Sequence, residues 1–271
     1  MDTPARRLLA TMPLHAITSA YGEDGLRERF ALEIAVFAGP ARRRVERALA
    51  LAGRLHAADR RQREPYVNHL LRVAIRILCY YGVRDADVVC AALLHDAVED
   101  HPAELGGGGQ QAALAADGGQ RAALATVAAG FGSRVAELVA AVTNPAWRPG
   151  QDQHEQYREH VAASLDRCPW ARVIKVSDFT DNGVGLIHTT GPALDRLAGK
   201  YAPLVPVLRE MIARSDTPLG DQAKAHIIGQ LDLAAQRFAA IRPSAGQRGP
   251  VRLSGPEAWW GARGSNPEPT G

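Results

Sequence analysis

The chain has 271 residues, of which 46% are hydrophobic and 23% are charged, and its formal net charge is +3. This composition is close to that of soluble globular proteins, so it excludes wholesale disorder and collagen-like or other low-complexity architectures. The small basic excess argues against a dedicated nucleic-acid-binding protein, which usually carries a concentrated basic stripe.

No apolar stretch reaches the roughly 18 to 20 residues that a membrane-spanning helix needs. The N-terminal segment lacks the apolar core and the small-residue cleavage site of a secretory signal, so we expect a cytoplasmic protein with no membrane partner. The cysteines Cys79, Cys90 and Cys168 form no CxxC pair and predict neither a disulfide framework nor a thiolate zinc site. The sequence gives no indication of the oligomeric state.

We expect an all-α protein, because apolar residues recur at helical spacing and no period-two alternation is long enough for a sheet. Residues 1–25 are predicted to be a weakly ordered lead-in, residues 26–242 one helical domain, and residues 243–271 a disordered tail rich in Gly and Pro. In chain order, helices are predicted over residues 26–55 with a break at Gly39-Pro40, 66–81, 86–100 after the N-cap Asp85, 112–142 with interruptions at Gly118-Gly119 and residues 130–132, 152–165, 170–186, 194–214 and 221–241.

Polar residues interrupt the end of the most apolar predicted helix, in the segment of residues 95–100. On a continuous helix Glu99 lies four residues after His95, and Asp100 lies four after Asp96, so these side chains share one side. Three carboxylates beside an imidazole repel one another, and burying them is costly unless a cation or arginine partners neutralise them. The segment therefore predicts either a bound divalent metal or a polar helix end exposed to water.

A second histidine, His69, lies near the start of the helix that precedes His95. If the two helices pack antiparallel, the start of the first and the end of the second lie at the same end of the hairpin. His69 and His95 are then predicted to lie close together. The alternative is a structural, hydrogen-bonding role for His69.

A third polar stripe lies in the predicted helix of residues 170–186, where Lys175, Asp178 and Asn182 recur at spacings of three and four. A carboxylate from this helix, together with the two histidines and Asp96, would give a mixed nitrogen and oxygen site. Such a site suits Mn, Fe or Zn. The alternative is a buried ion pair between Lys175 and Asp178.

These residues resemble the H…HD…D signature of HD-domain metal-dependent phosphohydrolases, and more narrowly the hydrolase domain of RelA/SpoT-type proteins and the small alarmone hydrolases. The resemblance covers about residues 50–210. An LLHDxVED string with an upstream PYxxH is highly specific, whereas a bare HD dipeptide is not. The matching strings are His56 followed by Arg61, EPYVNH at 64–69, ALLHDAVED at 92–100, KVSD at 175–178 followed by Asn182, and YAPL at 201–204.

The resemblance implies an all-α HD-domain helical bundle, a divalent metal that is usually Mn²⁺, and an anionic nucleotide substrate. The family reaction removes the 3′ pyrophosphate from guanosine tetra- or pentaphosphate. The implied metal ligands are His69, His95, Asp96 and Asp178. The implied catalytic residues, which position or deprotonate the attacking water, are Glu99 and Asp100. The implied substrate-binding residues are Arg61, Lys175 and Asn182.

The sequence departs from the family pattern in two places. The basic loop before PYxxH is one residue shorter than usual, and where the family reads ADRLHNMRT this chain reads SDFTDNGVG at 177–185, which keeps the Asp and the Asn. The alternatives are therefore a different HD nucleotide phosphohydrolase or a metal-loaded nucleotide-binding regulator without turnover. Five further histidines are predicted to be structural or surface residues: His101, His154, His160, His188 and His226.

Overall fold

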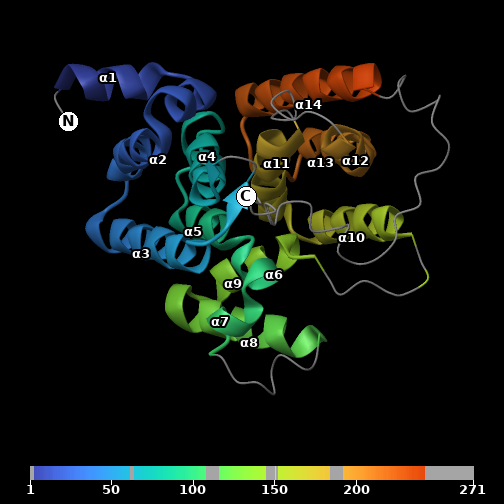
Figure 1. Cartoon of the computed structure of the whole chain (residues 1–271), viewed down its shortest axis with the longest axis horizontal. Coiled ribbons are helices and arrows are strands. Elements are labelled where there is room, and N and C mark those ends of the chain that lie inside the picture. The colour runs from blue at the N-terminus through green and yellow to red at the C-terminus, as the bar shows by residue number, and fades with distance from the viewer. Residues whose placement is uncertain are drawn as a thin grey trace, which may run out of the picture.

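The computed structural model describes residues 3–61, 64–107, 116–144, 150, 152–183 and 192–241. Its elements, labelled in Figure 1, are α1 (Thr3–Thr11), α2 (Leu14–Glu33), the 3₁₀ helix η1 (Ile34–Val36), α3 (Gly39–Leu55), β1 (Arg60–Arg61), β2 (Glu64–Pro65), α4 (Val67–Cys79), α5 (Ala86–Leu94), α6 (Ala97–Asp100), α7 (Pro102–Leu105), α8 (Ala116–Phe131), α9 (Ser133–Val142), α10 (Gln153–Arg167), α11 (Pro169–Gly183), α12 (Pro192–Tyr201), α13 (Leu204–Ala213) and α14 (Asp221–Ile241).

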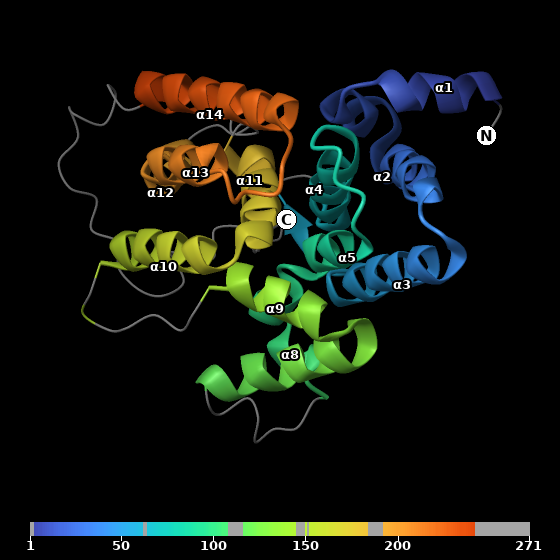
Figure 2. The same ribbon diagram turned by 180° about the vertical axis from the view of Figure 1, so that it is seen from behind.

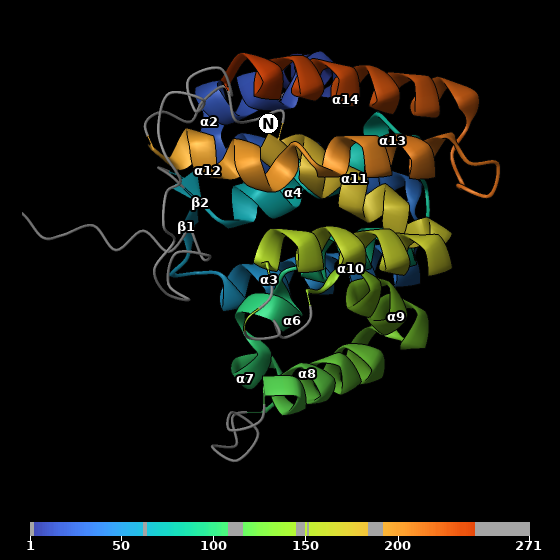
Figure 3. The same cartoon turned by 90° about the vertical axis from the view of Figure 1, so that its right-hand side faces the viewer.

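The described residues form a helical bundle, which confirms the predicted all-α class. Helices α4, α5 and α11 lie at its centre, where α4 packs against both of the others, and α9 packs on α5 and α11 (Figures 1 and 2). Helix α2 covers α4, α3 covers α5, and α10, α13 and α14 pack against α11. Figure 3 shows these helices stacked in layers between α14 and α8. The strands β1 and β2 form a two-residue antiparallel pair that the sequence did not predict.

The α4–α5 hairpin owes its geometry to its turn. Gly82 adopts a φ of +68°, a left-handed conformation that glycine tolerates without steric cost. Asp85 then caps α5, because its carboxylate accepts hydrogen bonds from the backbone N–H groups of Asp87 (2.9 Å) and Val88 (3.4 Å). This confirms the predicted cap. The two helices run antiparallel, so the start of α4 lies beside the end of α5.

The N-terminal residues differ from the predicted lead-in, because residues 3–11 are helical and so are residues 14–25 apart from a kink at Gly22. Pro13 separates α1 from α2 and the kink divides α2, so the apolar positions fall on short segments without a clear helical period. Packing against the bundle nevertheless buries Leu9, Leu14 and Ile17 to 6% exposure or less. Tertiary contacts therefore order a segment whose local pattern is weak. The domain limits of 26 and 242 stay a prediction.

Three predicted helices are interrupted in the structure. The helix predicted over 112–142 is divided at Gly132, whose φ of +102° ends α8, which confirms the interruption predicted at residues 130–132. The interruption predicted at Gly118-Gly119 is wrong, because α8 runs through both residues. The helix predicted over 194–214 is divided before Pro203, which cannot donate a backbone hydrogen bond. The helix predicted to reach Asp100 ends at Leu94, and α6 follows after a two-residue turn. The predicted tail, residues 243–271, lies outside the described residues.

None of the described helices is both long enough and apolar enough to cross a membrane. The three cysteines are free thiols. Cys90 is fully buried in α5, whereas Cys79 and Cys168 are half-buried.

Arg172 in α11 is fully buried and joins this helix to the segment after α13. Its guanidinium donates hydrogen bonds to the Leu165 carbonyl (2.8 Å) and to both carboxylate oxygens of Asp216 (2.7 and 3.0 Å).

We expect Arg172→Met to lower the free energy of unfolding by about 2 to 4 kcal/mol, because these charge-assisted bonds are lost and a buried carbonyl loses its donor. Arg209→Met, which removes an exposed pair with Asp232, should change it by less than about 0.5 kcal/mol. Equal denaturant midpoints for the two variants would contradict this expectation.

Candidate metal centre and active site

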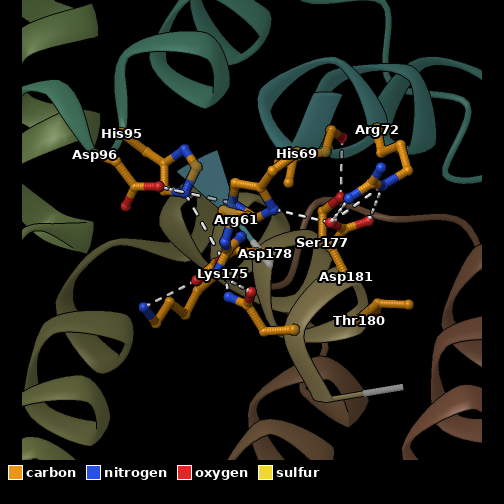
Figure 4. A network of polar contacts seen from close by, with 12 residues as sticks. Arg61, His69, Arg72, His95, Asp96, Lys175, Ser177, Asp178, Thr180 and Asp181 are labelled. Carbon is orange, nitrogen blue, oxygen red and sulfur yellow. Dashed lines mark hydrogen bonds and ion pairs between the residues drawn. The ribbon is translucent and has the colours of Figure 1, made fainter. Parts of the chain in front are cut away.

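The three central helices bring together the residues predicted as metal ligands (Figure 4). The His69 Nε2 atom, from α4, lies 3.5 Å from Asp178 Oδ1 in α11 and 3.6 Å from Asp96 Oδ2. The His95 Nε2 atom, at the end of α5, lies 3.7 Å from Asp178 Oδ1 and 3.0 Å from Asp96 Oδ2. One donor atom each from His69, His95 and Asp178 lies within 4.8 Å of the others. The predicted proximity of His69 and His95 is therefore observed.

The hydrogen bonds of the two imidazoles show which nitrogens face this cluster. His95 Nδ1 lies 2.8 Å from the Ala92 carbonyl, which only accepts, so Nδ1 carries a proton and donates it. His69 Nδ1 lies 2.9 Å from Asp181 Oδ2 and donates in the same way. Both Nε2 atoms are buried without a hydrogen-bond partner among the described residues, although carboxylate oxygens lie beside them. Two imidazole lone pairs and two carboxylates that converge in a buried site fit a divalent cation.

Electrostatics at the cluster favour positive charge. Burial disfavours the imidazolium form of His95, but the Asp96 and Asp178 carboxylates outweigh burial and raise the pKa of His95 to about 10. Burial likewise opposes ionisation of Asp178, yet the Lys175 ammonium and the two histidines hold its pKa well below the usual value. In the protein alone, protons supply this charge. A bound metal would displace them, so metal affinity should rise with pH.

Asp181 orients His69 and was not identified from the sequence. Its carboxylate accepts the His69 Nδ1 hydrogen bond and forms ion pairs with Arg72 (2.9 Å) and Arg76 (3.1 Å) while its side chain is only 6% exposed (Figure 4). A carboxylate on the outer nitrogen of an imidazole is typical of metal-ligating histidines. The sequence feature that could have identified Asp181 is its spacing, because it lies three residues after Asp178 and therefore on the same side of the helix.

A second supporting contact comes from Tyr66, at the start of α4. The Tyr66 hydroxyl donates a 2.7 Å hydrogen bond to Asp96 Oδ2, and its ring stacks on His56 with centroids 4.5 Å apart. The aromatic side chain thus holds the Asp96 carboxylate at the cluster. This role of Tyr66 was not predicted either.

The three predicted substrate-binding residues are linked to Asp178. Lys175 donates to Asp178 Oδ2 (3.2 Å), so the ion pair considered from the sequence is present, and Asn182 donates to Asp178 Oδ1 (2.5 Å). Arg61 in turn donates to Asn182 and lies over the Tyr66 ring, with its guanidinium carbon 5.2 Å from the ring centroid. The β1–β2 pair, which carries Arg61, therefore brings a guanidinium next to the metal cluster.

Another cation, which the sequence did not single out, lies on the same side. The ammonium groups of Lys175 and Lys200 lie 5.5 and 5.1 Å from the centroid of the buried Tyr157 ring. Of the two, Lys175 joins this ring to the acidic cluster through its ion pair with Asp178. Arg61 and Lys175 thus place two cations beside the cluster, which suits the oxygens of a phosphate ester.

The two residues of the predicted acidic pair, Glu99 and Asp100, lie in different environments. The helix interruption at His95 and Asp96 changes the shared face expected for a continuous helix, and Glu99 turns toward the end of α9. Its carboxylate accepts hydrogen bonds from the Asn144 side chain (2.8 Å) and backbone N–H (3.2 Å). Asp100 is half-buried, and burial together with the neighbouring carboxylates, Asp96 first among them, raises its pKa to about 8. A carboxyl group with this pKa can exchange a proton near neutral pH.

The raised pKa of Asp100 leads to a stability prediction for the metal-free protein. The carboxyl group titrates near 3.8 in the unfolded chain and near 8 in the folded one, so unfolding releases a proton between these values and stability falls as pH rises. Asp100→Asn has no proton to release. We therefore expect the variant to gain stability over the parent as pH rises from about 5 to 8.5, measured by urea unfolding with a chelator present. A stability difference that is independent of pH would contradict the assignment.

The comparisons with known proteins agree with this geometry. An HD-domain family model matches residues 48–168, a range that includes His69, His95 and Asp96. The matched range is slightly less than half of the chain. It is 33% identical over 135 residues to guanosine-3′,5′-bis(diphosphate) 3′-pyrophosphohydrolase MESH1 from Homo sapiens, a match that covers 48% of this chain and 63% of the human protein. It is 31% identical over 140 residues to guanosine-3′,5′-bis(diphosphate) 3′-pyrophosphohydrolase of Aquifex aeolicus, covering 51% of this chain and 17% of that protein.

The chain thus spans less than two thirds of the length of the curated relatives that it matches. A solved structure is similar over 72% of this chain and 94% of its own, with 26% identity and a TM-score of 0.53. That structure is described by the words "A metazoan ortholog of SpoT hydrolyzes ppGpp and plays a role in starvation responses". The likeness extends beyond the matched HD-domain range, which ends before Asp178.

Proposed function

We propose that the protein is a metal-dependent phosphohydrolase that removes the 3′ pyrophosphate from guanosine 3′,5′-bis(diphosphate) or a close relative of it. The observation that carries the proposal is the convergence of the buried Nε2 atoms of His69 and His95 on the carboxylates of Asp96 and Asp178. Three of the four residues lie in the range that matches the HD-domain family model, and the relatives that the chain matches are named for that reaction. We further propose Mn²⁺ as the metal and the cytoplasm as the location.

The metal ligands that we propose are His69, His95, Asp96 and Asp178. A divalent cation bound by them would lower the pKa of a bound water and offset negative charge on the phosphoryl oxygens. Asp181 keeps His69 in the tautomer whose Nε2 lone pair faces the cluster. The protein's own task at the cluster is therefore to hold two neutral imidazoles and two carboxylates in place.

The remaining polar residues have separate proposed roles. Asp100, with its raised pKa, accepts a proton from the attacking water. Glu99, held by Asn144, positions that water. Lys175, Arg61 and Asn182 contact the substrate, where the two cations offset phosphate charge.

One departure favours a second candidate, another HD nucleotide phosphohydrolase. The family motif places a histidine three residues after the metal aspartate, whereas this chain has Asp181, which is bound to Arg72 and Arg76. The segment of α11 that follows the metal aspartate thus differs from the family pattern. A change of this kind can alter which phosphate ester is accepted.

Incubation of the manganese-loaded protein with a nucleotide panel tests the proposal. The panel contains guanosine 3′,5′-bis(diphosphate), its pentaphosphate form and nucleoside 5′-monophosphates, and anion-exchange chromatography separates the products. We expect guanosine 5′-diphosphate and pyrophosphate from the first substrate. Release of single phosphates from the monophosphates alone would favour the second candidate, and binding without any product would indicate a regulator.

A further inference from the structure

A second cluster of potential ligands lies outside the metal centre described above. It combines His56 at the end of α3, Asp59 just before β1, and His101 between α6 and α7. Asp59 Oδ2 lies 2.8 Å from His56 Nδ1 and 2.7 Å from His101 Nε2, so two imidazoles converge on one carboxylate oxygen. From the sequence, His101 is predicted to be structural, and His56 has no assigned role.

The surroundings hold both rings in place. His56 is fully buried as a side chain and stacks on Tyr66, with an interplanar angle of 9°. His101 meets the His56 ring edge-on, with centroids 4.6 Å apart, and its side chain is 15% exposed. The two imidazoles therefore have little freedom to turn away from Asp59.

The outer side of His101 carries the contact that is typical of a ligating histidine. Its Nδ1 atom lies 3.4 Å from Glu104 Oε2, while Nε2 faces Asp59. Both ring nitrogens thus face carboxylates, and a neutral imidazole can donate to only one of them. If the N–H group is directed at Glu104, the Nε2 lone pair faces the Asp59 carboxylate and the two repel each other. A cation bound between them would remove this repulsion.

We propose that His56, Asp59 and His101 form a second divalent-cation site of the zinc type. Two imidazoles and one carboxylate are a ligand set that zinc accepts, with a fourth position for water. The Asp59 side chain is 28% exposed, so that position can face solvent. With bonds of about 2.0 to 2.1 Å, tetrahedral ligand atoms lie about 3.3 Å apart, so each imidazole nitrogen needs to move away from Asp59 Oδ2 by only about half an ångström.

A cation at this site would join three segments that lie beside the active site. Asp59 directly precedes the strand that carries Arg61, and His101 directly follows Asp100. A cation bound there would therefore hold Arg61, a proposed substrate contact, and Asp100, a proposed proton acceptor, in place relative to the end of α3. The proposed site follows from the positions of His56, Asp59 and His101 and does not depend on the proposed reaction.

Zinc stoichiometry tests the proposal. Chelator-treated protein is loaded with zinc chloride, excess metal is removed by gel filtration, and zinc is measured by elemental analysis. We expect two equivalents in the parent, one in His101→Gln, one in Asp178→Ala, and none in the double variant. His226→Gln, which alters a histidine stacked on Tyr80 outside both clusters, is the matched control and should keep two.

A single equivalent in the parent that is lost in Asp178→Ala, or two equivalents in His101→Gln, would overturn the proposal. Circular dichroism and gel filtration show whether each variant folds. Should His101→Gln not fold, Asp59→Asn keeps the shape of the side chain and removes its charge, and it should also bind one equivalent. Cobalt(II) offers a second readout, because its visible absorption in the parent should lose one component in either variant.

Discussion

Asp178→Ala is expected to bind one equivalent of manganese fewer than the parent and to lose hydrolysis with it. Asp178 Oδ1 lies within 3.7 Å of both Nε2 atoms, so the carboxylate is shared by His69 and His95. Removal of an outer partner of a metal ligand typically costs about 10- to 100-fold in affinity, and removal of a ligand itself should cost more. Elemental analysis after gel filtration measures the metal, and release of product measures the activity.

Two further variants make this result specific. His95→Ala removes a different ligand from α5 and should have the same effect, without leaving Lys175 unpaired as Asp178→Ala does. Asp232→Ala removes an exposed carboxylate from α14 and should leave metal and activity unchanged. Manganese content equal to the parent in Asp178→Ala or His95→Ala would refute the ligand assignment.

Glu99→Gln is expected to keep the metal and to bind nucleotide while turnover falls by about 10² to 10⁴, or roughly 3 to 5 kcal/mol of barrier. Glutamine preserves the shape of the side chain and can still accept the hydrogen bond from the Asn144 side chain. It lacks the negative charge that a water-positioning carboxylate supplies. Measurement of kcat beside metal content separates this role from metal binding.

The matched variant for this experiment is Asp100→Asn, the other member of the acidic pair. If Asp100 is the proton acceptor, its loss should lower kcat at least as much as the loss of Glu99 does. If Glu99→Gln turns over substrate within a few-fold of the parent, the water-activation role is wrong for Glu99. The acidic cluster would then act as an electrostatic clamp on the metal.

The sequence predicted those features that depend on local spacing. The limits of α14, the Asp85 cap and the proximity of His69 to His95 all follow from helical periodicity or from the short hairpin turn. The family resemblance added Asp178, which is more than 100 residues from His69 in the chain. Spacing alone could not have paired residues at that separation.

The features that the sequence did not predict depend on tertiary contacts. The bond between Glu99 and Asn144 joins residues 45 positions apart, and the contact between His101 and Asp59 joins residues 42 apart. No periodic pattern connects such positions. The order of α1 likewise depends on packing that buries Leu9, because its local apolar signal is weak.

The placement of the ligands on α4, α5 and α11 has a consequence for the unfolded chain. A cation shared by His69, His95 and Asp178 would act as a cross-link that closes loops of very different length, one inside the α4–α5 hairpin and one of more than 100 residues. Closing the longer loop removes more conformational entropy from the unfolded ensemble. Metal would therefore protect the whole central region against proteolysis, including the chain between α5 and α11, and this protection would scale with free metal concentration.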